Sequence, residues 1–250
     1  MSEIVAKITN LSHKYKDVIA LEDINLELPK GKMIGLIGPD GVGKSTLLAI
    51  LSGTKVIQKG RVEVLNFDIS IQKARDIVCP KVAYMPQGLG KNLYMTLSVY
   101  ENIEFFAKLF GLDKQQRKKR ILQLLQSTDL IKFKDRPAGK LSGGMKQKLG
   151  LCCALIHDPE ILILDEPTTG VDPLSKREYW KLINLIKNKN KNMSVLIATA
   201  YMQEAATFDA IIAMDDGKIL MNGTLEEILK NTNSLDIDEA FIKLLPDEKR

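Results

Sequence analysis

The chain has 250 residues, of which 45% are hydrophobic and 27% are charged, and its formal net charge is +5 at pH 7. This length fits one large α/β domain with a small subdomain. The composition is ordinary for a globular protein and excludes a disordered chain or a coiled coil. The mildly basic charge balance is compatible with a membrane-facing or RNA-facing partner but requires neither.

The cysteines and the longest apolar runs restrict the class further. The cysteines, Cys79, Cys152 and Cys153, form no disulfide framework and no CxxC motif. We therefore expect a protein from a reducing compartment that has no structural metal site. The apolar runs at residues 149–156 and 161–164 fall far short of the ~18 residues that a transmembrane helix needs. Any role at a membrane is therefore expected to involve another chain or domain.

In chain order, the first predicted elements are two strands, residues 4–11 and 24–28, in which apolar and polar residues alternate as in half-exposed antiparallel strands. Short apolar clusters then alternate with helical patterns, which indicates a parallel sheet covered on both faces. These clusters are residues 33–37, 82–85, 161–164, 195–198 and 211–214, and residues 44–51 are the first predicted helix.

The middle of the chain has helical rather than strand periodicity. Its apolar positions are Val99, Ile103, Phe106, Phe110, Ile121, Leu124 and Leu125. We therefore predict a core of residues 1–88 and 158–222 with an N-terminal antiparallel β subdomain, a helical subdomain over 89–157, and a helical tail over 223–250. Asp172 and Pro173 are expected to cap and open a helix, and Asp216-Gly217 to turn a β-hairpin.

A glycine-rich segment lies between the strand at 33–37 and the helix at 44–51. It reads Gly38-Pro39-Asp40-Gly41-Val42-Gly43-Lys44-Ser45 and matches the phosphate-loop pattern G-x-x-x-x-G-K-[ST]. Such a loop turns backbone N–H groups and a helix N-terminus toward phosphates. Lys44 is then expected on the β- and γ-phosphates and Ser45 on Mg²⁺, with Thr46 as a further phosphate contact. The alternative, a glycine-rich turn with a surface lysine, fits this position poorly.

Two carboxylates, Asp165 and Glu166, follow the apolar run at 161–164. Because parallel α/β sheets bind ligands at the carboxyl ends of their strands, both are expected at the nucleotide. Asp165 is predicted to hold Mg²⁺, and Glu166 to act as general base for the attacking water. A strand that ends in a solvated acidic turn is the alternative for this pair taken alone.

The segment Leu141-Ser142-Gly143-Gly144-Met145-Lys146-Gln147 resembles the signature motif of the ATP-binding-cassette (ABC) ATPases, and the resemblance extends over nearly the whole chain. It implies a P-loop NTPase core with a mixed, mainly parallel sheet, and ATP and Mg²⁺ as ligands. It further implies that Tyr15 stacks on adenine, that Gln87 senses Mg²⁺ and the γ-phosphate as a catalytic group, and that Asp172 belongs to the loop following the carboxylates.

The same resemblance implies a dimer. In this family Ser142, Gly143 and Gly144 would face the nucleotide of a second ATPase domain, so that one chain cannot complete a site alone. Ala200 occupies the position of the family's histidine, which contacts the γ-phosphate. Losing one such donor costs on the order of 3 kcal/mol, so slow hydrolysis is expected at this site. His13 and His157 are no substitutes by position. A non-identical partner domain is favoured over an identical copy.

Residues 85–94, 148–157 and 198–202 are similar to the first ATPase domain of the ribosome-associated ABC ATPases. That resemblance implies an ABC-2-type transmembrane permease as partner and a location on the cytoplasmic face of the inner or plasma membrane. It leaves open a ribosome or tRNA-remodelling role and a non-hydrolysing ATP switch. The basic stretches at 114–120 and 187–191 fit RNA or lipid headgroups, but such short clusters are more often solvated helix faces.

Overall fold

A six-stranded sheet forms the centre of the computed structural model, which describes residues 3–246 and 248. Its strands are β3 (Met33–Ile37), β6 (Val82–Met85), β7 (Ile161–Asp165), β8 (Ser194–Thr199), β9 (Ala210–Asp215) and β10 (Lys218–Gly223). Their order is β10-β9-β3-β8-β7-β6, in which only β10 runs antiparallel to its neighbour. The carboxyl ends of five parallel strands therefore meet at one edge.

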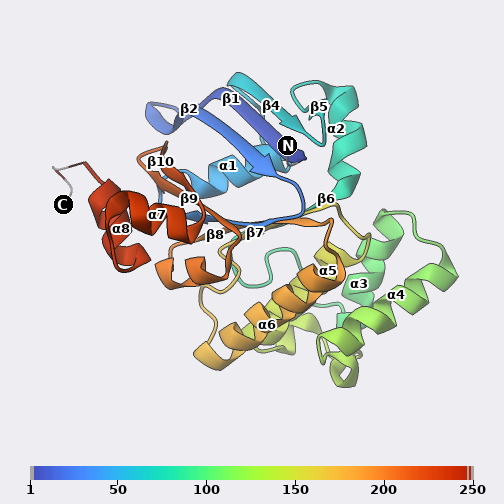
Figure 1. The fold of residues 1–250 in the computed structure, drawn as a ribbon. Coiled ribbons are helices and arrows are strands. Elements are labelled where there is room, and N and C mark those ends of the chain that lie inside the picture. Colours follow the sequence, from blue (N-terminus) through green and yellow to red (C-terminus); the bar gives the residue numbers. More distant parts are fainter. Residues whose placement is uncertain (1–2, 247, 249–250) are drawn as a thin grey trace.

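A second, antiparallel sheet lies above the first (Figure 1). Its strands are β1 (Ile4–Tyr15), β2 (Val18–Pro29), β4 (Lys59–Val64) and β5 (Phe67–Asp68), in the order β2-β1-β4-β5. Buried and exposed residues alternate along β2. One face of this sheet is thus packed and the other is open to water, as the alternating sequence predicts.

Eight α-helices complete the described fold. They are α1 (Lys44–Leu51), α2 (Gln72–Val78), α3 (Val99–Leu109), α4 (Lys114–Ser127), α5 (Gly143–Leu155), α6 (Pro173–Lys189), α7 (Leu225–Thr232) and α8 (Ile237–Leu244). Figure 1 shows α1 between the two sheets, α5 and α6 on the opposite face of the larger sheet, and α3 and α4 to one side. None of the helices in the described residues is long and apolar enough to cross a membrane.

Strands β3, β7 and β8 are buried on both faces because they are almost entirely apolar, whereas the edge strand β10 stays partly exposed. In β3, Ile34 and Leu36 pack in the core that surrounds α1, whereas Met33 and Ile37 pack in the core beneath α5 and α6. Successive side chains of a strand point to opposite faces, so one short apolar run contributes to both cores. This packing holds the ends of the strands, where the carboxylates lie, in fixed relative positions.

The structure confirms most of the predicted elements and adds two strands, one α-helix and four short 3-10 helices. The helix over 44–51, the strands over 33–37 and 82–85 and the capped helix at Asp172-Pro173 are present as expected. Asp216 and Gly217 both have positive φ, as the tight hairpin turn requires. β4, β5 and α2 were not predicted, because β4 is short, charged and begins beside a glycine. The division into core, helical subdomain and tail stays a prediction, and residues 1, 2, 247, 249 and 250 lie outside the described residues.

Candidate active site

The loop between β3 and α1 has a backbone that only glycine fits at two positions. Gly43 has φ of 104°, and a Cβ there would lie 2.2 Å from the Ala20 carbonyl oxygen. A Cβ at Gly38 would likewise lie 2.2 Å from the Met214 carbonyl oxygen. Helix α1 starts directly after Gly43 with no side-chain cap and no acidic residue in its first turn. Its first N–H groups are therefore available to an anion such as a phosphate.

Lys44 points back into this loop. Its Nζ donates hydrogen bonds to the carbonyl oxygens of Gly38, at 2.8 Å, and Pro39, at 2.7 Å, and lies 3.8 Å from Glu166 Oε1. The residue is 3% exposed, and burial lowers the pKa of its amino group while the Glu166 carboxylate opposes that shift. A compact cation on a short loop is suited to bridge phosphate oxygens.

Three oxygen groups meet at the carboxyl ends of β6 and β7. Ser45 Oγ donates to Asp165 Oδ1 at 3.0 Å, and the Tyr84 hydroxyl donates to Asp165 Oδ2 at 3.2 Å. Burial raises the pKa of Asp165, and these two hydrogen bonds partly offset the increase. The described residues contain no cluster of three or more metal-binding side chains. Mg²⁺ is usually held by one or two protein oxygens together with substrate phosphates, and the Ser45–Asp165 pair fits that pattern.

Glu166 follows Asp165 with an unusual backbone. Its φ of 46° is left-handed, a conformation that costs a non-glycine residue about 1 kcal/mol or more. The carboxylate accepts hydrogen bonds at Oε2 from Gln87 Nε2, at 2.7 Å, and from Thr169 Oγ1, at 3.1 Å. Burial raises the pKa of Glu166, with Lys44 opposing the shift. A raised pKa brings this carboxylate closer to the range in which a general base works.

One cavity of about 360 Å³ is lined by Lys44, Ser45, Gln87 and Glu166, whereas Asp165 lies behind Ser45 and is not part of its lining. Its lining is Tyr15, Val18, Ile19, Ala20, Asp40, Gly41, Gly43, Lys44, Ser45, Thr46, Gln87 and Glu166. The Tyr15 hydroxyl lies 3.2 Å from Thr46 Oγ1, which places the ring beside the phosphate loop. The sequence did not predict that Val18 and Ile19 line the cavity; both are apolar residues that are largely exposed at the start of β2. Val42 packs in the core instead of lining the cavity.

The signature residues lie apart from this cavity. Ser142 caps α5 by accepting a hydrogen bond from the Met145 N–H at 3.3 Å, as predicted. Gly144 packs so closely on Ser175 that a Cβ would lie 2.6 Å from its side chain. Neither Ser142, Gly143 nor Gly144 lines the cavity that holds Lys44 and Glu166. The N-terminus of α5 therefore lies outside the cavity formed by the chain's own phosphate loop.

Ala200 and the two histidines also lie elsewhere. Ala200 lines a different cavity, of about 610 Å³, together with Trp180 and Tyr201. His13 is buried against the edge of Tyr15, with ring centroids 4.9 Å apart, and His157 stacks on Phe110 at 3.7 Å. No imidazole lines the 360 Å³ cavity among the described residues.

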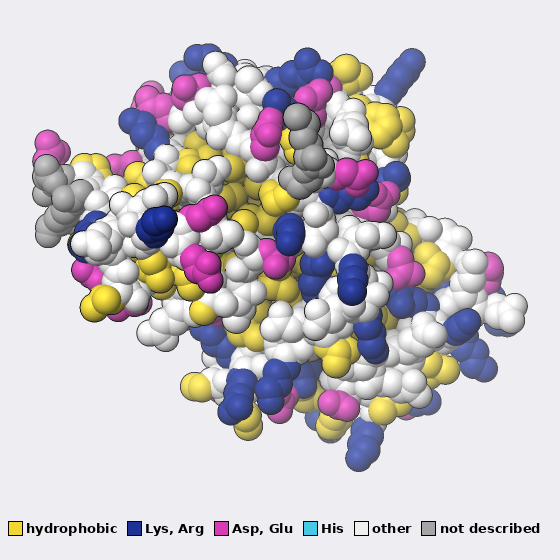
Figure 2. Space-filling model, in the orientation of Figure 1, with side chains coloured by type: hydrophobic (Ala, Val, Ile, Leu, Met, Phe, Trp, Pro, Cys, Tyr) yellow, Lys and Arg dark blue, Asp and Glu magenta, His cyan; other side chains and the backbone are white. Residues whose placement is uncertain are grey.

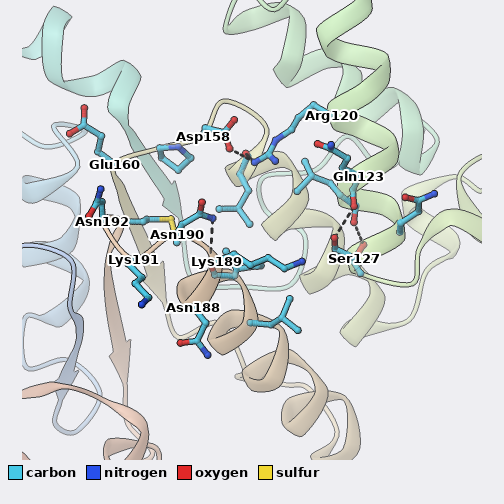
Figure 3. A pocket seen from close by; sticks show the side chains of 18 of the residues that line it. Arg120, Gln123, Ser127, Asp158, Glu160, Asn188, Lys189, Asn190, Lys191 and Asn192 are labelled. Atoms are coloured by element: carbon cyan, nitrogen blue, oxygen red, sulfur yellow. Dashed lines mark hydrogen bonds and ion pairs between the residues drawn. The ribbon is translucent and has the colours of Figure 1, made fainter.

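A larger cavity, of about 970 Å³, lies at the opposite edge of the sheet (Figure 3). Side chains at the end of α6, such as Lys189 and Asn190, there face Gln123 and Ser127 of α4. Its residues Glu160 and Met193 stand at the amino ends of β7 and β8, remote from the carboxylates. This cavity therefore has no part in the chemistry of Lys44 and Glu166, despite its size.

A phosphate loop opening a helix, a buried lysine and two carboxylates at the carboxyl edge of a parallel sheet define a P-loop nucleotide-binding ATPase. The sequence model of the family described as ABC transporter matches residues 21–169, and the chain belongs to this family. It is accordingly an ABC-type ATPase that binds ATP.

Known relatives agree with this assignment. The chain is 38% identical over 226 residues to the probable multidrug ABC transporter ATP-binding protein YbhF of Escherichia coli, covering 89% of this chain and 38% of YbhF. It is 31% identical to the ABC transporter ATP-binding protein NatA of Bacillus subtilis, covering 95% and 97% of the two chains. The chain thus spans well under half of YbhF but nearly all of NatA.

Solved structures share the fold. The cbiO1 protein of Clostridium perfringens, described as part of the ABC transporter complex cbiONQ, has a TM-score of 0.83 at 28% identity and covers 92% of each chain. The ATP-binding cassette MJ0796, described as a dimer bound to ADP and Pi after hydrolysis, has a TM-score of 0.78 at 25% identity, covering 88% of this chain and 98% of its own.

Proposed function

We propose that this chain is the ATP-hydrolysing subunit or domain of an ABC exporter with an ABC-2-type permease, and that ATP-driven closure of a dimer moves the membrane partner. The observation that carries this proposal is the separation of the Ser142–Gly144 segment from the cavity of Lys44 and Glu166. A helix N-terminus can bind an anion, and one placed away from its own phosphate loop is positioned to meet the nucleotide of a second ATPase domain. The dimeric MJ0796 structure supports this arrangement.

The residues of the cavity divide the work of hydrolysis. Tyr15 stacks on adenine, while the loop N–H groups and Lys44 bind the phosphates. Ser45 and Asp165 would hold Mg²⁺, which would neutralise phosphate charge there. Glu166 accepts a proton from water as the water oxygen attacks the γ-phosphorus, and the bond from that phosphorus to the β–γ bridging oxygen breaks, which yields ADP and phosphate. Gln87 orients the base, because its Nε2 donates a hydrogen bond to Glu166 Oε2 at 2.7 Å.

Ala200 makes this site slow in the proposed function. Alanine supplies no donor to the charge that develops on the γ-phosphate, and a missing donor costs on the order of 3 kcal/mol, or 10²–10³ in rate. Because Lys44, Gln87 and Glu166 are all in place, slow hydrolysis is favoured over a switch that never hydrolyses. We favour a dimer with a non-identical ATPase domain, whose own site receives the signature of this chain.

An exposed apolar patch supports the membrane partner. Leu89, Tyr94 and Met95, from the loop that follows Gln87, are 37%, 47% and 39% exposed. Phe105 of α3 packs edge-on to Tyr94, with ring centroids 4.6 Å apart, and is itself 39% exposed. Clustered apolar side chains on a surface usually mark an interaction site. A partner docked there would sense movement of Gln87 and would hold the chain at the cytoplasmic face of a membrane.

The names of relatives favour export. DrrA of Mycobacterium tuberculosis, named a doxorubicin resistance ATP-binding protein, is 34% identical over 230 residues, covering 92% of this chain and 66% of DrrA. The ribosome-associated alternative stays a prediction. Figure 2 shows Lys and Arg side chains spread among Asp and Glu on this face, without the continuous basic surface that RNA binding favours.

Steady-state ATP hydrolysis with Mg²⁺ tests the proposal, with ATP affinity measured separately by a fluorescent ATP analogue. Glu166→Gln is expected to abolish the remaining hydrolysis while leaving affinity within about twofold, because only the base is lost. Glu160→Gln is the matched control. Glu160 directly precedes β7, at the opposite end of the strand from Glu166, and forms an ion pair with Lys81 at 2.9 Å. Equal rates for the parent and Glu166→Gln would refute the assignment of the base.

A further inference from the structure

Glu204 is a buried carboxylate outside the nucleotide cavity. It is 7% exposed and lies in the segment that follows β8. Its Oε1 accepts hydrogen bonds from Thr168 Oγ1, at 3.0 Å, and Trp180 Nε1, at 3.1 Å, and pairs with Lys176 Nζ at 2.7 Å. Its Oε2 is buried with no hydrogen-bond partner in the described part of the chain. Burying a charge this deeply is costly unless several partners compensate, so the arrangement calls for an explanation.

The three donors come from two different segments. Thr168 belongs to the loop after Glu166, in which the next residue, Thr169, donates to the Glu166 carboxylate at 3.1 Å. Lys176 and Trp180 belong to α6, the helix that Asp172 caps. Glu204 Oε1 thus connects three segments, namely the loop over residues 167–171 that follows Glu166 (the catalytic loop), α6, and the segment over residues 200–207.

Lys176 makes a second contact with the segment over residues 200–207. Its Nζ lies 3.6 Å from the ring centroid of Tyr201, and Tyr201 adjoins Ala200. In a chain with alanine at 200, the segment has no side chain at that position that could reach a phosphate. Within the described residues, the side-chain hydrogen bond from this segment to the catalytic loop is the one between Glu204 and Thr168.

We propose that Glu204 is a positioning residue that joins the catalytic loop to α6. Nucleotide bound beside Glu166 would then change the position of α6. The inference rests on the proposed function of Glu166 in the nucleotide site. Helix α6 follows directly from the loop that contains Gly170, which lies beside the signature residue Gly143. Through this joint, occupancy of the chain's own site alters the surface that it offers to a second ATPase domain.

The only tryptophan of the chain, Trp180, donates to Glu204 and therefore reports on the joint. The experiment follows Trp180 emission of the full chain, excited where adenine absorbs little, on addition of Mg²⁺ and a non-hydrolysable ATP analogue. Nucleotide affinity is measured in parallel with a fluorescent ATP analogue. The parent is compared with Thr168→Val and Glu204→Gln, which each remove part of the joint while preserving side-chain volume.

Thr207→Val is the matched control, because the Thr207 hydroxyl bonds the backbone carbonyl of Glu204 at 2.7 Å and not its carboxylate. We expect nucleotide to change Trp180 emission in the parent and in Thr207→Val. We expect that response to be lost in Thr168→Val and Glu204→Gln, with affinity unchanged, because neither residue lines the nucleotide cavity. The rate of hydrolysis should fall about tenfold in both variants, equivalent to about 1.4 kcal/mol.

The outcomes distinguish a failure of the role proposed for Glu204 from a failure of the proposed function. A response that persists in both variants, or a parent that binds nucleotide without any change in Trp180 emission, overturns the role of Glu204. Loss of the response in Thr207→Val as well also overturns it, because the effect would then belong to the segment and not to the carboxylate. A parent that does not bind the fluorescent analogue contradicts the proposed function itself.

Discussion

Gln87 Nε2 donates a hydrogen bond to Glu166 Oε2 at 2.7 Å, and so links the residue that follows β6 by two positions to the residue that directly follows β7. The other oxygen of the same carboxylate lies 3.8 Å from Lys44 Nζ. The proposed base is therefore held between a residue of the phosphate loop and a residue that leads to the exposed patch at Leu89, Tyr94 and Met95. Movement of a partner docked on that patch would be transmitted to Glu166 by the side chain of Gln87.

Replacing Gln87 by alanine tests this link. Loss of a hydrogen bond to a charged group costs about 1.5–3 kcal/mol, so kcat is expected to fall roughly 10- to 100-fold. KM for ATP should change little, because Lys44 and the loop N–H groups are the proposed phosphate ligands. Steady-state kinetics over a range of ATP concentrations measures both. Gln123→Ala, an exposed glutamine of α4, is the control, and an unchanged kcat for Gln87→Ala would contradict the orienting role.

Replacing Ala200 by histidine should restore a donor to the γ-phosphate. Hydrolysis is expected to rise by about 10²-fold, since one preorganised donor is worth on the order of 3 kcal/mol. The comparison is steady-state ATP hydrolysis of the parent and Ala200→His, each with Glu166 and with Glu166→Gln. The gain should vanish in the Glu166→Gln background. A parent that hydrolyses ATP briskly, with no gain from histidine, would show instead that the alanine is tolerated.

Replacing Ser142 by aspartate tests the separated signature. Aspartate is also a good N-cap, so α5 keeps its cap, but the new negative charge would repel a phosphate of the opposite nucleotide. Binding of the fluorescent ATP analogue by the chain alone should be unchanged, because Ser142 does not line its cavity. ATP-dependent association, measured by sedimentation, should be lost.

Ser98→Asp is the control for this change, because Ser98 caps α3 in the same way. That variant should associate like the parent. Weaker nucleotide binding by isolated Ser142→Asp chains would mean that the signature serves its own site.

His157 makes the stability of the fold sensitive to acid. It is packed against Phe110, and burial lowers its pKa from 6.5 to about 4. Between these values the unfolded chain binds more protons at this residue than the folded chain does, so the free energy of unfolding falls as the pH falls from about 6.5 toward 4. Between pH 7.5 and 5 the loss at His157 is expected to be about 1–2 kcal/mol.

Urea unfolding at both pH values measures this difference in the parent and in His157→Phe, which keeps the ring stacked on Phe110. The phenylalanine variant should lose less stability on acidification. His13→Phe is a useful comparison, because burial lowers the pKa of His13 as well and its contribution is then measured separately. Identical pH dependence in the parent and His157→Phe would exclude His157 as the source.

The local elements of this protein are predictable from its sequence. The phosphate loop, the helix over 44–51, the caps at Ser142 and Asp172 and the hairpin at Asp216-Gly217 each depend on residues close in the chain. Glycine conformations, N-caps and periodic apolar runs are short-range properties, so they can be recognised from the printed order of residues. The roles of the site residues came from the order of those motifs and from the family resemblance.

Which side chains meet across the sheet depends instead on the tertiary structure. The Ser45–Asp165 contact spans 120 residues, and the third partner of that group, Tyr84, had no signal in the sequence. The same holds for β4, which gains its strand geometry by pairing with β1, and for Glu204, whose donors lie 24 to 36 residues away. Such contacts depend on strand order and helix placement, which bring distant segments together and which local periodicity does not encode.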